Sequence, residues 1–119
     1  MERDETDVVG RYLGCIVAHD WVGMARCLTD DVVRVGPFGD TYTPREPYVA
    51  FLSGLMPQLP NYSMRIARVA YAGRVAFAEL SETMDVDGAP LETPEVLVFE
   101  LDEAGLISHI AIYIQQRPR

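Results

Sequence analysis

The chain has few of the residues on which metal and nucleic-acid chemistry depend. Its 119 residues include two cysteines, two histidines, and 10 basic side chains against 18 acidic ones, for a net charge of -8. Cys15 and Cys27 form no C-x-x-C pair, and His19 and His109 lie far apart in the sequence, so a zinc site is not expected. Binding to nucleic acid or to an anionic membrane is disfavoured, because no basic patch offsets the repulsion of phosphates.

Long apolar runs are also missing. No stretch approaches the roughly 20 residues that span a bilayer, and the acidic residues 1–5 do not resemble a signal peptide. We therefore expect a cytoplasmic protein in which Cys15 and Cys27 are reduced and buried. A hydrophobic content of 49% and a charged content of 24% are typical of globular proteins, so residues 1–119 are interpreted as one domain.

The first half of the chain has helical patterns. Apolar residues recur every three or four positions over residues 8–17, which predicts an amphipathic helix. A second helix is predicted from an Asp20 cap to about Leu28. Thr43 and Glu46 have the spacing of a capping box, so a third helix is predicted over residues 43–56.

Strand patterns dominate the second half. Strands are predicted over residues 62–71, 74–86, 93–101 and 106–115, after a short candidate at 32–35. Between two of them, Asp87-Gly88 is typical of a two-residue hairpin, because both central positions of a type I′ turn need positive φ. The sequence therefore predicts an α+β domain, with three N-terminal helices packed on a curved antiparallel sheet.

The predicted hairpin determines which side chains share a face. One face is apolar except for Glu82, Thr93 and Glu95, so it is predicted to face the helices. The other face is mixed, which suits solvent or a partner subunit. The predicted pairs are Val86 with Ala89, Glu82 with Thr93, and Leu80 with Glu95.

One pair of motifs has a spacing found in a known family. Tyr12 lies 24 residues before Gly36, which opens the sequence Gly-Pro-Phe-Gly at residues 36–39. This spacing resembles the ketosteroid isomerase branch of the nuclear transport factor 2-like superfamily, and the order of the predicted elements fits along nearly the whole chain. The resemblance implies a cone whose open end admits small hydrophobic molecules, and a homodimer formed through the outer face of the sheet.

The same resemblance implies a loss of catalytic groups. Gly36 stands where the isomerases have their proton-shuttling aspartate, and Leu97 stands where they have the protonated aspartate of the oxyanion hole. Only Tyr12 remains of that set, so ketosteroid isomerase activity by the family mechanism is not expected. The superfamily also includes SnoaL-type polyketide cyclases and limonene epoxide hydrolase-like enzymes, several of which place acidic groups on sheet strands.

Glu82 and Glu95 are the candidate catalytic residues. Their predicted positions are diagonal, roughly 7–8 Å apart at Cα, and two like charges in an apolar site raise at least one pKa. One glutamate then acts as general acid and the other as base; the alternative is that both are solvated or pair with Arg65 or Arg68. Tyr12 is a candidate hydrogen-bond donor to a substrate oxygen, with a core role as the alternative.

The predicted function is that of a small pocket protein. We expect a cofactor-independent isomerase, cyclase or epoxide hydrolase-like enzyme that acts on an apolar ligand such as a polyketide or terpenoid fragment, with no metal. The alternative is a non-catalytic ligand-binding or dimerisation module. Phe77, Val96, Val98 and Tyr113 are predicted to centre a homodimer contact. The residues predicted to line the pocket are Ile16, Trp21, Phe38, Phe51, Leu80, Met84, Thr93, Leu97, Phe99 and Ile112.

Overall fold

The computed structural model describes residues 7–115; the acidic residues 1–5 lie outside this range. The elements follow in the order α1 (Val8–Ala18), α2 (Trp21–Ala25), β1 (Leu28–Val35), β2 (Thr41–Tyr42), α3 (Arg45–Leu55), η1 (Met56–Gln58), β3 (Ser63–Ala72), β4 (Val75–Val86), β5 (Ala89–Leu101) and β6 (Ile107–Ile114). Within the described part of the chain, no helix is long and apolar enough to cross a membrane.

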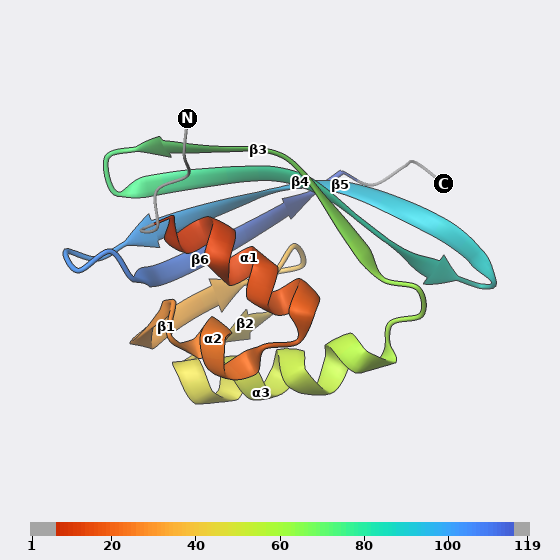
Figure 1. The fold of residues 1–119 in the computed structure, drawn as a ribbon, viewed down its shortest axis with the longest axis horizontal. Helices are drawn as coiled ribbons and strands as arrows, with labels where there is room; N and C mark the ends of the chain where they lie inside the picture. The colour runs from red at the N-terminus through yellow and green to blue at the C-terminus, as the bar shows by residue number, and fades with distance from the viewer. Residues whose placement is uncertain (1–6, 116–119) are drawn as a thin grey trace.

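The strands form one curved sheet with the order β2-β1-β6-β5-β4-β3 (Figure 1). Strands β3 to β6 are an antiparallel meander, as predicted. The sheet as a whole is mixed, because β1 runs parallel to β6, so the prediction of a purely antiparallel sheet was wrong. Strands β1 and β2 also separate α2 from α3, and the three helices are therefore not one N-terminal block.

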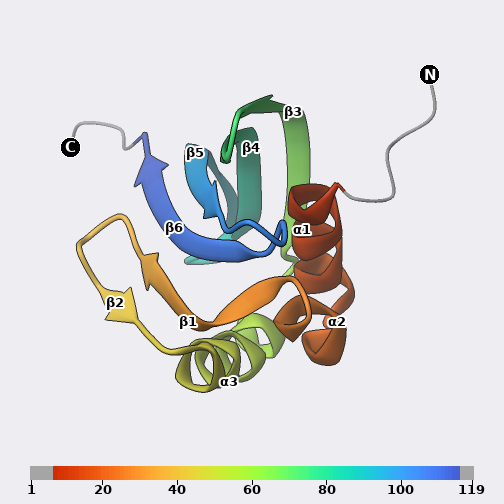
Figure 2. The same ribbon diagram turned by 90° about the vertical axis from the view of Figure 1, so that its left-hand side faces the viewer.

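The helices gather on one side of the curved sheet. Helix α1 lies beside β3, and α3 lies under β1 and β2 (Figures 1 and 2). The core fills the space between them, where Tyr12, Leu13 and Phe99 are fully buried. The edge of the Tyr12 ring meets the face of the Phe99 ring at a centroid distance of 5.7 Å, which joins α1 to the inner face of β5.

The β4–β5 hairpin has the predicted register. Val86 pairs with Ala89 across the turn, and Asp87 and Gly88 have φ values of 54° and 83°, as a type I′ turn requires. Burial decreases along the inner face of β4, from Ala76, which is fully buried, to residues near the turn, which are half-buried or exposed. In Figure 1 this end of the hairpin extends beyond the helices, so the inner face is uncovered there.

The predicted end of the second helix and the predicted cap of the third were wrong. Asp20 caps α2 by accepting a hydrogen bond from the Gly23 amide at 2.9 Å, but the helix ends at Ala25 because Leu28 already pairs with β6. The capping box at the third helix is absent, since no side chain caps α3. The Thr43 hydroxyl donates instead to the Val32 carbonyl at 2.7 Å, which ties the start of α3 to β1.

Candidate functional site

The two candidate glutamates lie on the same face of neighbouring strands. Glu82 pairs with Thr93 and Glu95 pairs with Leu80, so the carboxyl groups are diagonal neighbours on the inner face. Glu95 is 8% exposed, whereas Glu82, nearer the turn, is half-buried. The hairpin therefore brings one buried and one partly accessible carboxyl group together.

The surroundings of the pair favour retention of a proton on Glu95. Burial, followed by the hydrogen bond and the negative charge of Glu82, raises the pKa of Glu95 to about 9, against a smaller opposite effect of Arg34. The Tyr62 hydroxyl donates to Oε2 of Glu82. Burial and the charge of Glu82 raise the pKa of Tyr62 far above its ordinary value. At neutral pH the arrangement holds a protonated Glu95 beside a Glu82 that accepts hydrogen bonds.

A second polar group, a tyrosine pair, lies deeper in the core. The hydroxyl groups of Tyr12 and Tyr48 are hydrogen-bonded to each other, and both side chains are 1% exposed. Burial raises the pKa of Tyr12 well above its ordinary value and raises that of Tyr48 to about 12. Both hydroxyls therefore keep their protons at neutral pH, and one of the two protons is free to be donated elsewhere.

Arg34 completes this cluster. It lies on β1 with its side chain 11% exposed, and its Nη1 forms an ion pair with Asp40 at 2.9 Å. Burial raises the pKa values of Tyr12, Tyr48 and Glu95, and the positive charge of Arg34 opposes this rise in part. One cation is thus close to both tyrosines and to the buried glutamate.

The predicted lining residues are divided between three environments. Ile16, Leu80, Leu97 and Phe99 are buried in the core. Phe51, Met84, Thr93 and Ile112 are half-buried, and the Phe51 ring stacks on Tyr42 at 3.9 Å. Trp21 is also half-buried, whereas Phe38 is exposed.

Trp21 and Phe38 lie outside the polar cluster. The Trp21 ring stacks on His19 at 5.5 Å and lines a hollow of about 420 Å³ between α2 and α3. Phe38 is 74% exposed and lines a separate hollow between the β1–β2 loop and β6. The structure therefore does not bring these two side chains together with the glutamates.

Three residues of the cluster were missed by sequence reasoning. Tyr48 and Tyr62 carry no local motif. Arg34 had a recognisable pattern, because it alternates with Val32, which is buried, and a basic residue on the buried face of a strand is uncommon. The alternative in which Glu82 and Glu95 pair with arginines of β3 is not what the structure shows. Arg65 pairs with Glu92 and Arg68 with Glu79.

With this geometry established, comparison with known proteins places the chain in a family. The model of the SnoaL-like domain matches residues 9–110. The chain belongs to the SnoaL-like domain family. None of the curated proteins matches it.

Solved structures show the same fold. A protein with a ketosteroid isomerase-like fold from Catenulispora acidiphila DSM 44928, in complex with trimethylamine, has a TM-score of 0.79 at 16% identity, over 90% of this chain and 84% of its own. A candidate SnoaL-like polyketide cyclase from Shewanella denitrificans OS-217 has a TM-score of 0.81 at 13% identity, with coverages of 93% and 90%. An LEH-like epoxide hydrolase of M. tuberculosis has a TM-score of 0.78 at 18% identity, over 91% of this chain and 80% of its own. At these identities the similarity establishes the nuclear transport factor 2-like fold and no activity.

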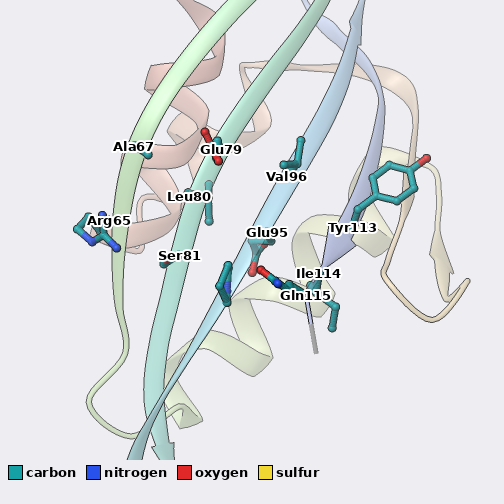
Figure 3. Close-up of a pocket in the computed structure, with 11 residues that line it drawn as sticks. Arg65, Ala67, Glu79, Leu80, Ser81, Glu95, Val96, Tyr113, Ile114 and Gln115 are labelled. Carbon is teal, nitrogen blue, oxygen red and sulfur yellow. The ribbon is translucent and has the colours of Figure 1, made fainter. Parts of the chain in front are cut away.

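The outer side of the SnoaL-like domain has a hollow of its own. It measures about 470 Å³ and is bordered by residues of β3 to β6, among them Arg65, Ser81, Val96 and Tyr113 (Figure 3). Glu95 also borders it.

The two cysteines and the metal ligands give little chemistry. Cys27 is buried as predicted, but Cys15 is half-buried, and both thiols are free. They border a hollow of about 540 Å³ between α1 and α2. Among residues 7–115, no group of three or more His, Cys, Asp or Glu side chains is arranged to hold a metal ion.

The raised pKa of Glu95 predicts a pH-dependent stability. The folded protein holds this proton after the unfolded chain has released it, so folding is favoured at low pH. This advantage is lost as pH rises from 4.5 to about 9. In urea denaturation from pH 4 to pH 9, Glu95→Gln should abolish this loss and be more stable than wild type at pH 7 by on the order of 2 kcal/mol.

The matched control is Glu92→Gln, which changes an exposed carboxyl on the same strand. Its stability should follow the wild-type pH profile. A Glu95→Gln profile parallel to wild type across the whole range would show that Glu95 does not retain its proton.

Proposed function

We propose that this SnoaL-like domain is a cofactor-independent enzyme that uses Glu82 and Glu95 for acid–base chemistry on a small hydrophobic molecule. The observation that carries the proposal is the burial of Glu95 against Glu82, which raises the pKa of Glu95 so that it can act as a general acid near neutral pH. Such pairs are a general solution for acid–base catalysis near neutral pH. A polyketide or terpenoid fragment fits the apolar side chains around them.

The two carboxyl groups have complementary roles in this proposal. Glu82, as the carboxylate, removes a proton from a substrate carbon next to a carbonyl or from a water molecule. Glu95 donates its proton to the oxygen atom on which negative charge develops, and Tyr12 or Tyr48 donates a further hydrogen bond. The substrate is neither oxidised nor reduced, so isomerisation, ring closure and epoxide opening all fit, and no cofactor is needed.

Ketosteroid isomerase chemistry by the family mechanism does not fit this chain. Gly36 offers no side chain to move a proton, and Leu97, which is 5% exposed, offers no hydrogen bond to an oxyanion. The acidic groups have moved to β4 and β5. The LEH-like enzyme and the candidate polyketide cyclase are therefore more useful guides to the reaction class than the isomerases.

A second candidate function is a pocket or dimerisation module without catalysis. It is favoured by the dense packing under α1, where Tyr12, Tyr48 and Phe99 fill the inner face with their own side chains. In that case the half-buried end of the inner face, near the β4–β5 turn, binds a ligand without converting it. Turnover separates the two functions, because both allow binding.

The acid–base proposal predicts a specific loss of turnover. Wild-type protein is first screened by thermal shift against apolar ketones and epoxides, where a ligand at a hundred times its Kd should stabilise by about 2.7 kcal/mol. With a hit that is converted, Glu82→Gln and Glu95→Gln should each lower kcat at least about a hundredfold. Glu92→Gln is the control and should keep wild-type kcat. Ligands that bind but are never converted would favour the non-catalytic module.

We further propose that the domain forms a homodimer through the outer face of the sheet. Phe77, Val96 and Tyr113 are 39%, 36% and 62% exposed and lie on that face beside the half-buried Val98. An apolar patch of this kind is typical of a protein contact.

The dimer predicts a sedimenting species of twice the 13.3 kDa chain mass at micromolar concentration. Tyr113→Asp, which places a charge in the exposed patch, should shift it to monomer without unfolding the protein. A wild-type protein that sediments as a 13.3 kDa species throughout this range would contradict the dimer.

A further inference from the structure

The absence of a side chain at Gly36 leaves room for its neighbours Arg34 and Asp40. A Cβ atom built on Gly36 would lie 2.7 Å from Nη1 of Arg34 and closer still to the carboxylate of Asp40. A side chain at this position would force the ends of the Arg34 and Asp40 side chains to move. The glycine therefore leaves the space in which the Arg34–Asp40 ion pair lies.

Aromatic rings hold the Arg34 guanidinium in place. Its Cζ lies 5.7 Å from the ring centroid of Tyr42, 5.9 Å from that of Tyr48 and 5.6 Å from that of Phe51. Distances of this size allow cation–π attraction. Asp40 holds the guanidinium from the side of the β1–β2 loop, and the charge is consequently fixed between β2, α3 and the core.

One donor of this fixed cation is unsatisfied. Among the described residues, Nε of Arg34 is buried without a hydrogen-bond partner. An unpaired buried donor on a charged group destabilises the folded protein, and an arginine cannot relieve this by losing its proton. A ligand oxygen that carries partial negative charge would supply the missing partner.

We propose that Arg34 binds the acidic oxygen of a phenol or enol ligand, and that Gly36 is the residue that admits the Arg34–Asp40 pair to the site. The inference rests on the proposed inner-face site and adds a substrate class to it. Glu82 and the net charge of -8 oppose a carboxylate ligand. A phenol or enol enters neutral and develops charge only beside the guanidinium.

The inference is tested with three nitroarene probes of the same shape. 4-Nitrophenol has an acidic oxygen, 4-nitroanisole has the same oxygen blocked by a methyl group, and 4-nitrobenzoate is a permanent anion. Wild-type protein should bind 4-nitrophenol at least about tenfold more tightly than either of the others. At a pH below the pKa of the free phenol, where the free probe is neutral, the absorbance of the bound phenol should shift towards that of the phenolate, with the proton released to solvent.

Variants test whether Arg34 itself causes the preference for the phenol. Arg34→Met, and Gly36→Ala, which expels the ion pair, should reduce the preference for the phenol to less than about threefold. Both should also abolish the absorbance shift. Arg65→Met is the control, because Arg65 lies on the outer face in an ion pair with Glu92, and it should behave as wild type. Circular dichroism confirms folding.

If Arg34→Met does not fold, Arg34→Lys and Gly36→Ala test the inference instead. Lysine keeps the positive charge but lacks Nε and the fork geometry of the guanidinium. Both must lose at least about threefold of the preference. A preference that survives in the folded variants overturns the inference, as does a wild-type protein that does not distinguish the probes or bind them. The result is independent of catalysis, because probe binding and absorbance are measured without turnover.

Discussion

The two-residue turn at Asp87-Gly88 determines which side chains of β4 and β5 enter the inner face. Because the side-chain period of a strand is two, a slip of one residue would turn over one of the two strands, and either Glu82 or Glu95 would face solvent with the apolar residues of its strand. Positive φ at both turn positions maintains the observed register. Burial of Glu95 follows from this register, because its strand neighbours Leu97 and Phe99 lie under the helices on the same face.

The charged groups on the inner face of the sheet influence one another. Burial makes ionisation of both glutamates costly, so one proton stays on Glu95. Arg34 supplies the positive charge, neutralised in part by Asp40 from the adjacent loop. The tyrosine pair separates the cation from the apolar core and keeps its own protons. The site therefore has a proton donor, a proton acceptor and a cation without any metal ligand set in the described chain.

Local patterns predicted the hairpin and the inner-face position of the two glutamates, because turn chemistry and strand alternation depend on neighbouring residues. The parallel pairing of β1 with β6 was not predictable in this way, since it joins distant segments. The same contact shortened α2 by drawing Leu28 into the sheet. The prediction for Thr43 failed because its hydroxyl found a partner on β1. Arg34 was overlooked because its burial depends on α3 and β2 together.

The central claim is that Glu95 carries a proton at neutral pH because it is buried beside Glu82. Carbon-13 NMR of protein labelled at the glutamate side-chain carboxyl carbons measures this directly as a function of pH. The account predicts one carboxyl signal that still has the chemical shift of the protonated acid at pH 7 and that disappears in Glu95→Gln. Complete ionisation of every glutamate below pH 6 would contradict the account.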